Sequence, residues 1–276
     1  FNNDIVSLPI TQLQDSINYF TGVTLNEGTR PTDVYSANSL LLAYYAGAAI
    51  PFSKKLNLST GVRLESNNQK LVSIGQTTLV DTTVTRLLPS ATFTYNVTKK
   101  LLARLAYYRT LNRPEFRELS AFSFYDFNLK ADKVGDPKLK TADIHNVDVR
   151  LEYYPSPEEM ISIGVFYKKF FNPIELYQLP GTSNFLFVFG NAKESQSQGV
   201  ELEIRKSLGF ISPGSILERF SILFNGALIR STLDLGQNIS GTQINNRPMQ
   251  GQSPYVINTG LFYTDDKRGW QASVMY

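Results

Sequence analysis

The stretch that decides the fold class is Leu56-Asn57-Leu58-Ser59-Thr60-Gly61-Val62-Arg63-Leu64-Glu65. Its even-numbered positions are apolar except for Thr60, and its odd-numbered positions are polar or glycine. Successive side chains of a β-strand point to opposite faces of a sheet, so this alternation predicts a strand with one apolar and one polar face. Arg63 and Glu65 share the polar face.

The same alternation recurs along the chain and predicts an all-β protein. It is clear at residues 90–96, 146–153, 161–168 and 200–205, and weaker strands are expected at 40–50, 101–110, 220–232, 255–263 and 270–276. Residues 114–119 are the one candidate helix, because Pro114 suits a first helical turn. We therefore expect an antiparallel meander of about ten strands over residues 39–276, preceded by an irregular loop or strand lead-in at residues 1–38.

Short and long connections alternate between these strands. The short ones cover residues 51–55, 97–100, 155–159, 208–218 and 264–269, and the long ones cover 67–83, 111–141, 172–184 and 234–254. Short turns at one end and long loops at the other are typical of outer-membrane β-barrels, whose strands cross the bilayer in ~9–11 residues. The rhythm therefore predicts that the meander belongs to a transmembrane β-barrel.

The direction of the apolar face separates a membrane barrel from a soluble sandwich. A barrel turns this face to lipid and its polar face to the lumen, whereas a sandwich buries the apolar face. Aromatic residues such as Tyr95, Tyr153 and Trp270 stand beside the short turns, as in an interfacial girdle. We therefore favour the barrel and predict that its lumen is lined by Arg63, Glu65, Asp148, Arg150, Glu152, Glu201, Glu203 and Arg205.

Composition excludes several classes of function. The 276 residues hold 27 Lys and Arg against 24 Asp and Glu, and a net charge of +3 is too small for a nucleic-acid binder. The chain has no cysteine and one histidine, which excludes disulfide frameworks and cysteine-based sites. It has neither an apolar run of ~18 residues nor a secretory signal at its start. The chain is either cytosolic or an excerpt from a longer precursor, and the barrel features favour the second reading.

Candidate ligand-binding residues gather in the long connections. Arginine side chains flank loops 111–141 and 234–254, and guanidinium groups suit carboxylates, phosphates or sugar hydroxyls. The competing explanation is structural, with the arginine–glutamate pairs closing locally. Aromatic residues in the first loop could stack on sugar rings or pack the loop down. The predicted ligand-binding residues are Arg113, Glu115, Arg117, Tyr125, Arg247 and Gln250.

No enzyme chemistry is expected. His145, the only imidazole, lies by parity with Val147 on the apolar face, which fits an interfacial residue better than a catalytic one. Asp126, Asp132 and Asp136 share a loop but lack the spacing of an EF-hand calcium site. We therefore predict that the protein is not an enzyme and has no catalytic residue, no metal site and no cofactor.

Five segments resemble, in order and spacing, the barrel of TonB-dependent outer-membrane receptors. Arg113-Pro114-Glu115-Phe116-Arg117-Glu118-Leu119 resembles the family's R-P-x-F-x-E-L segment, and Gly135-Asp136-Pro137-Lys138-Leu139-Lys140 resembles its G-N-P-x-L-K loop exit. The other segments lie at residues 166–175, 191–203 and 247–258, and the match spans about residues 38–276. Receptors of this family have a barrel of ~22 strands. The chain therefore looks like the C-terminal part of such a barrel, with the plug domain and TonB box outside it.

The resemblance implies uptake of a nutrient ligand across the Gram-negative outer membrane. The expected partners are outer-membrane lipid, the receptor's own plug domain, TonB and the imported small ligand, with a surface lipoprotein as a further candidate and no nucleic acid. The ligand stays open among siderophores, cobalamin, glycans and peptides. The alternative is an outer-membrane barrel for adhesion or secretion without TonB-coupled uptake, and a plug and TonB box upstream of Phe1 would separate the two.

Overall fold

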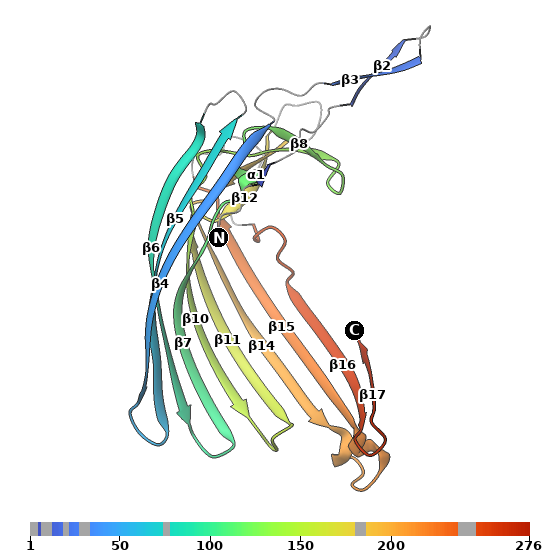
Figure 1. Cartoon of the computed structure of the whole chain (residues 1–276). Coiled ribbons are helices and arrows are strands. Elements are labelled where there is room, and N and C mark those ends of the chain that lie inside the picture. The colour runs from blue at the N-terminus through green and yellow to red at the C-terminus, as the bar shows by residue number, and fades with distance from the viewer. Residues whose placement is uncertain are drawn as a thin grey trace.

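One curved antiparallel sheet carries ten strands that follow each other as a meander (Figure 1). The computed structural model describes residues 34–73, 78–179, 186–236 and 247–276, and the backbone of three short strands before them. The sheet order is β1-β4-β5-β6-β7-β10-β11-β14-β15-β16-β17, which confirms the all-β meander. The ten strands are β4 (Tyr35–Pro51), β5 (Leu56–Ser73), β6 (Thr78–Asn96), β7 (Leu101–Asn112), β10 (Ala142–Tyr153), β11 (Met160–Phe171), β14 (Glu194–Ser207), β15 (Phe220–Asp234), β16 (Tyr255–Asp265) and β17 (Trp270–Met275).

The sheet is open. Its end members are β1 (Ile5–Val6) and β17, and no pairing joins them within the described residues. The lead-in at residues 1–38 also holds the hairpin of β2 (Leu13–Asn18) and β3 (Gly22–Glu27), and β4 begins at Tyr35, five residues before the start expected from the sequence. Nine of the ten strands have at least 11 residues, enough to cross a bilayer when tilted.

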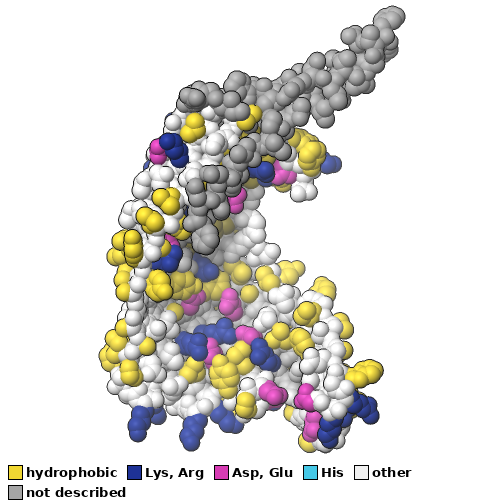
Figure 2. Space-filling view, viewed as in Figure 1, with side chains coloured by type: hydrophobic (Ala, Val, Ile, Leu, Met, Phe, Trp, Pro, Cys, Tyr) yellow, Lys and Arg dark blue, Asp and Glu magenta, His cyan; other side chains and the backbone are white. Residues whose placement is uncertain are grey.

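The apolar face of the sheet is exposed, and the polar face lines the hollow. On β10 and β14 the side chains of Val149 and Leu202 are 46% and 38% exposed, whereas Glu152 on the opposite face is 3% exposed. Figure 2 shows charged side chains gathered in the hollow of the sheet. No second sheet covers the apolar face among the described residues, so the sandwich interpretation is wrong. In water this face would cost about 25 cal/mol for each Å² of apolar surface left uncovered.

The short connections lie at one end of the strands and the long ones at the other, as expected (Figure 1). The connection after β14 contains two 3-10 helices, η2 (Leu208–Phe210) and η3 (Ile216–Arg219).

The prediction of a long loop at residues 67–83 is wrong, because β5 and β6 stay paired as far as Val72 and Thr78. Residues 74–77, 180–185 and 237–246 lie outside the described residues. We find no helix in the described part that is long and apolar enough to span a membrane.

Two of the remaining long connections, those after β7 and after β11, fold into a second, smaller sheet at the same end. Its strands are β8 (Ser123–Asp126), β9 (Ala131–Val134), β12 (Ile174–Leu179) and β13 (Leu186–Asn191), in the order β12-β13-β9-β8. β13 runs parallel to β9, which joins two connections that the sequence analysis treated as separate loops. The helix expected at residues 114–119 is present as α1 (Phe116–Leu119), but Pro114 precedes its N-cap Glu115 and is not in its first turn.

The largest buried cluster lies where α1 and β8 meet the large sheet. Leu71 of β5 is fully buried and lies on the same face as Glu65, because six residues separate them. Tyr35 stacks at an angle on Phe122, with 5.6 Å between ring centroids. The apolar core therefore sits at the long-loop end and not between two sheets. Its buried members are Tyr35, Ala37, Leu71, Val80, Leu119, Phe122 and Phe124.

Candidate functional site

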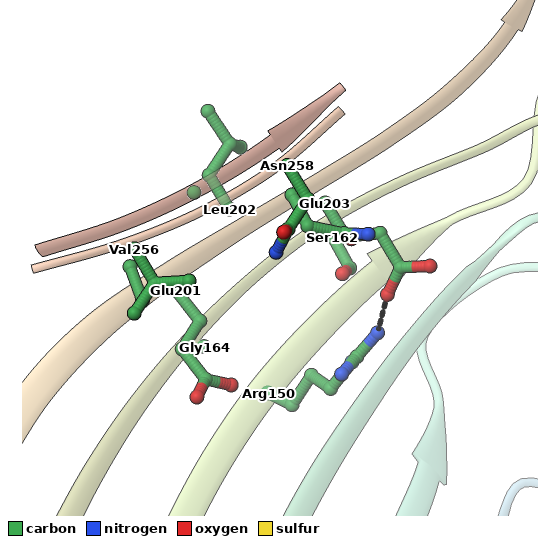
Figure 3. A pocket seen from close by; sticks show the side chains of 11 residues that line it. Arg150, Ser162, Gly164, Glu201, Leu202, Glu203, Val256 and Asn258 are labelled. Atoms are coloured by element: carbon green, nitrogen blue, oxygen red, sulfur yellow. Dashed lines mark hydrogen bonds and ion pairs between the residues drawn. The ribbon is translucent and has the colours of Figure 1, made fainter. Parts of the chain in front are cut away.

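A network of ion pairs crosses the concave face near the short-turn end of the strands. Arg150 of β10 donates to the Glu203 carboxylate of β14 at 2.7 Å, across β11 (Figure 3). Arg150 also lies 3.2 Å from Glu152, which in turn lies 3.5 Å from Arg104 of β7. Gly164 of β11 stands between Arg150 and Glu201 in register and leaves room for these longer side chains. A cavity of about 210 Å³ results, lined in part by these charged groups.

A second network lies nearer the long-loop end of the same face. Glu65 of β5 pairs with both Arg63 and Arg113, and Asp143 of β10 pairs with Arg86 at 3.2 Å and Arg109 at 2.8 Å. Four guanidinium groups thus share two carboxylates, so this part of the wall carries an excess of positive charge. It borders a cavity of about 410 Å³ that includes Arg63, Glu65, Arg109 and Arg113.

The other residues predicted to face the lumen are less constrained. Asp148 contacts the Tyr108 hydroxyl. Glu201 and Arg205 are exposed, and neither forms a salt bridge within the described part of the chain. The predicted row thus divides into a tightly paired part around Glu65 and Glu152 and a solvent-facing part along β14.

The first predicted ligand-binding cluster is built into the start of α1. Glu115 is the N-cap of α1, and its carboxylate and that of Glu118 each accept from the backbone N–H of the other residue. Burial, with the neighbouring Glu115 charge as a smaller cause, raises the pKa of Glu118. The Arg117 guanidinium lies 5.0 Å from the centre of the Phe124 ring. Arg113, as described above, is held by Glu65.

Two of the sequence motifs interlock at the C-terminal end of α1. Gly135 packs so closely there that a Cβ atom would collide with the carbonyl oxygens of Arg117, Glu118 and Ser120. The backbone N–H of Asp136 donates to the Glu118 carbonyl at 2.7 Å. The R-P-x-F-x-E-L and G-D-P-x-L-K segments therefore form one structural unit, although 15 residues separate Leu119 from Gly135.

The second predicted cluster is anchored by Glu175 of β12. The Arg247 guanidinium donates to the Glu175 carboxylate at 3.0 Å, and the backbone N–H of Gln250 donates to the same oxygen at 3.4 Å. The Glu175 side chain is 3% exposed. Burial, and then the neighbouring Glu175 charge, raises the pKa of Tyr177 to about 12. Both predicted clusters thus have structural partners, and within the described residues no hydrogen bond or salt bridge joins one to the other.

Asn191, within the motif at residues 191–203, forms hydrogen bonds to two other connections of the long-loop end. Its side-chain oxygen accepts from the Lys140 backbone N–H at 2.7 Å. Its amide donates to the carbonyls of Lys140 and Asn172 at 2.9 and 2.8 Å. One side chain at the end of β13 therefore links the connection between β9 and β10 to the connection between β11 and β12. A lone asparagine gives no local signal for such a role, and only the adjoining motif marks it.

The aromatic residues of loop 111–141 divide into two groups. Phe122 and Phe124 are buried in the core cluster, whereas Tyr125 and Phe127 are 47% and 83% exposed. Tyr125 and Phe127 meet edge to face with 5.1 Å between ring centroids. The packing explanation thus holds for the first pair, and the second pair is available for contact at the outer hairpin.

His145 and Asp126 have ordinary partners. His145 shares a hydrogen bond of 2.9 Å with the Tyr107 hydroxyl and meets the Phe171 ring edge to face. Asp126 pairs with Lys133 and accepts from two backbone N–H groups, and the hydrogen bond from Lys133 holds the pKa of Asp126 below its usual range. In the residues that the structure describes, no cluster of His, Asp and Glu could hold a metal ion.

Residues 4–276 match the family model described as "TonB dependent receptor-like, beta-barrel". The chain therefore belongs to the family of TonB-dependent receptor barrels, and the resemblance found in the sequence is confirmed. This family consists of outer-membrane transport receptors. No curated protein matches the chain.

Solved structures of such receptors share the fold. The alcaligin receptor FauA from Bordetella pertussis is 15% identical, with a TM-score of 0.54 over 84% of this chain and 35% of that chain. The ferric citrate transporter FecA is 12% identical, with a TM-score of 0.61 over 90% of this chain and 33% of that chain. The hemophore receptor HasR of Serratia marcescens, in complex with HasA and heme, is 13% identical, with a TM-score of 0.62 over 92% of this chain and 46% of that chain. The chain thus spans about a third to a half of these receptors, and its open sheet is part of a barrel wall.

Proposed function

We propose that this chain forms part of the barrel wall of a TonB-dependent importer in the Gram-negative outer membrane. The observation that carries the proposal is the pairing of an exposed apolar face with a charged concave face in a chain of this family. The apolar face meets outer-membrane lipid, and the concave face meets the receptor's own plug domain and the passing ligand. Energy comes from the inner membrane through TonB, so the chain itself needs no catalytic residue.

The two charged networks have different roles in this proposal. The network around Arg150 and Glu203 lies near the short turns, on the concave face that a plug inside the barrel would contact. The arginine-rich network around Glu65 lies nearer the long loops, where a ligand enters. Among the residues predicted to bind ligand, Tyr125 is the best placed, since it is exposed, whereas Arg113 and Arg247 hold carboxylates of the chain itself.

The imported ligand belongs to the nutrients that need active uptake: siderophores, cobalamin, glycans or peptides. Three structural neighbours are named for alcaligin, ferric citrate and heme, so iron chelates and heme are the first compounds to test. A surface lipoprotein is a further candidate partner at the long-loop end.

Deletion of the gene in its host, followed by growth on limiting nutrients, tests this function. We expect the deletion strain to grow poorly on one nutrient class. The full-length receptor should restore growth when TonB is present and should not restore it when TonB is also deleted. The second candidate, adhesion or secretion without uptake, predicts normal growth on every nutrient and a defect in attachment or export instead. A full-length receptor without a plug or TonB box would also favour that second candidate.

A further inference from the structure

Two neighbouring short turns of the large sheet are built to the same plan. The turn between β4 and β5 reads Ser53-Lys54-Lys55-Leu56, and the turn between β6 and β7 reads Thr98-Lys99-Lys100-Leu101. Each therefore places two adjacent lysines between a hydroxyl residue and a leucine. We refer to these eight residues as the lysine turns.

The hydroxyl residue fixes each turn in the same way. The Ser53 hydroxyl accepts from the backbone N–H groups of Lys55 and Leu56 at 3.2 and 3.0 Å. The Thr98 hydroxyl accepts from those of Lys100 and Leu101 at 3.1 and 3.0 Å. Ser and Thr bonds of this kind hold a turn in one conformation, so the lysines project from fixed backbone positions.

The two turns are adjacent in space. The backbone N–H of Asn96 donates to the Lys55 carbonyl at 2.8 Å, which links the base of the second turn to the first. All four lysines are exposed. Lys100 donates to the Pro155 carbonyl at 2.7 Å, whereas Lys54, Lys55 and Lys99 form no salt bridge among the described residues.

The other short turns at this end all contain acidic residues, some of them paired with basic residues of neighbouring strands. Glu159 pairs with Lys206 at 2.7 Å, and Arg219 pairs with Asp265 at 2.7 Å. The two lysine turns are therefore the short turns at this end that carry lysines and no acidic residue. Figure 2 shows lysine and arginine side chains along this lower edge.

The lysine turns continue directly from the exposed apolar face. Ile50 and Phe52 are 41% and 58% exposed beside the first turn, and Tyr95 is 44% exposed beside the second. An apolar and aromatic band followed at once by ammonium groups matches the order of acyl chain, interface and phosphate in a lipid leaflet. We infer that the lysine turns bind the phosphate headgroups of anionic phospholipids in the leaflet at the short-turn end. This inference rests on the proposed membrane function and adds a lipid preference to it.

The test compares spin-labelled phosphatidylglycerol with spin-labelled phosphatidylcholine at the boundary of full-length receptor reconstituted in phosphatidylcholine vesicles. We expect the wild-type receptor to immobilise phosphatidylglycerol preferentially, on the order of fivefold for each lysine that contacts a headgroup at low salt. High salt should reduce the preference, because the contacts are exposed. The preference should fall toward unity in K54Q/K55Q/K99Q and persist in K54R/K55R/K99R.

A matched control removes the same charge at the opposite end. K130Q/K138Q/K140Q changes three exposed lysines of the long-loop end and should leave the preference intact. A reconstituted wild-type receptor with no preference would overturn the inference and leave the proposed function standing. Loss of uptake in K54Q/K55Q/K99Q without any lipid preference in the wild type would instead assign the turns to an acidic periplasmic protein. Failure of the wild-type receptor to reconstitute at all would contradict the proposed membrane function itself.

Discussion

At the scale of single residues, side-chain direction decides what each substitution does. Val149 and Leu202 project from the exposed face, whereas their neighbours Asp148 and Glu203 lie on the concave face. A charge on the first face would have to enter lipid, and a lost charge on the second leaves a wet wall that can rearrange. Residues next to each other in sequence therefore have opposite tolerances.

Val149→Arg and Leu202→Arg should block membrane assembly of the full-length receptor. An arginine facing lipid near the bilayer midplane costs about 2–4 kcal/mol. Asp148→Ala and Glu203→Ala are the matched changes on the other face and should cost far less, since Arg150 keeps Glu152 as a partner after the second change. Resistance to unfolding in SDS, compared with and without heating, measures assembly. Equal damage from both pairs would contradict the assignment of faces.

Gly135→Ala should loosen the outer loop without preventing barrel assembly. The added Cβ would collide with three backbone carbonyl oxygens at the end of α1, and overpacking of this kind costs about 1–3 kcal/mol. Gly164→Ala is the control, because the nearest atom to its added Cβ is 3.7 Å away. Limited proteolysis of residues 111–141 on whole cells should distinguish the two variants. Identical cleavage would show that Gly135 is not needed for the packing of α1.

At the scale of elements, the small sheet is the feature that turns separate loops into one cap. β9 and β13 come from different connections, and Asn191 ties their ends to β10 and β12. The Arg247–Glu175 pair adds the connection before β16 to the same assembly. The loops at this end should therefore move together and not one by one.

Asn191→Ala should release this assembly. The change removes three hydrogen bonds, each of which contributes about 0.5–1.5 kcal/mol. Asn128→Ala lies in the same region at an exposed turn and is the control. Hydrogen exchange should speed up around Lys140 and Asn172 in the first variant only. Faster exchange confined to residue 191 itself would show that the connections are independent.

The alternation of β10 and β14 was sufficient to predict those strands, because one face of each is apolar and the other is polar. The half of β5 nearer the long loops was missed, because Ser66-Asn67-Asn68-Gln69-Lys70 is polar on both faces. The alternation of apolar and polar residues therefore gives no strand signal there. The β9–β13 pairing was missed for a different reason. Four- and six-residue strands that pair in parallel across 51 residues depend on tertiary contacts and leave no local pattern.

At the scale of the whole molecule, orientation follows from the two unlike ends of the sheet. The lysine turns lie at one end and the β8–β9 hairpin at the other (Figure 1). Family architecture puts short turns in the periplasm and long loops outside. Lys130 and Asn245 are therefore expected outside, and because Asn245 lies outside the described residues, Lys130 marks the long-loop end.

Single-cysteine labelling of intact cells tests the orientation. Lys130→Cys should react with an impermeant thiol reagent, and Lys99→Cys should react only after the outer membrane is opened. The chain has no cysteine of its own, so each signal has one source within these residues. Reaction at residue 99 and none at residue 130 would reverse the orientation.

The central claim is that the apolar face of the sheet meets lipid and the concave face meets an aqueous lumen. A cysteine scan of β10 in full-length receptor tests it most directly, with an impermeant, water-soluble thiol reagent applied to opened outer membranes. The account predicts reaction at positions 148, 150 and 152 and protection at 147, 149 and 151. Labelling without a two-residue period, or with the opposite phase, would contradict it.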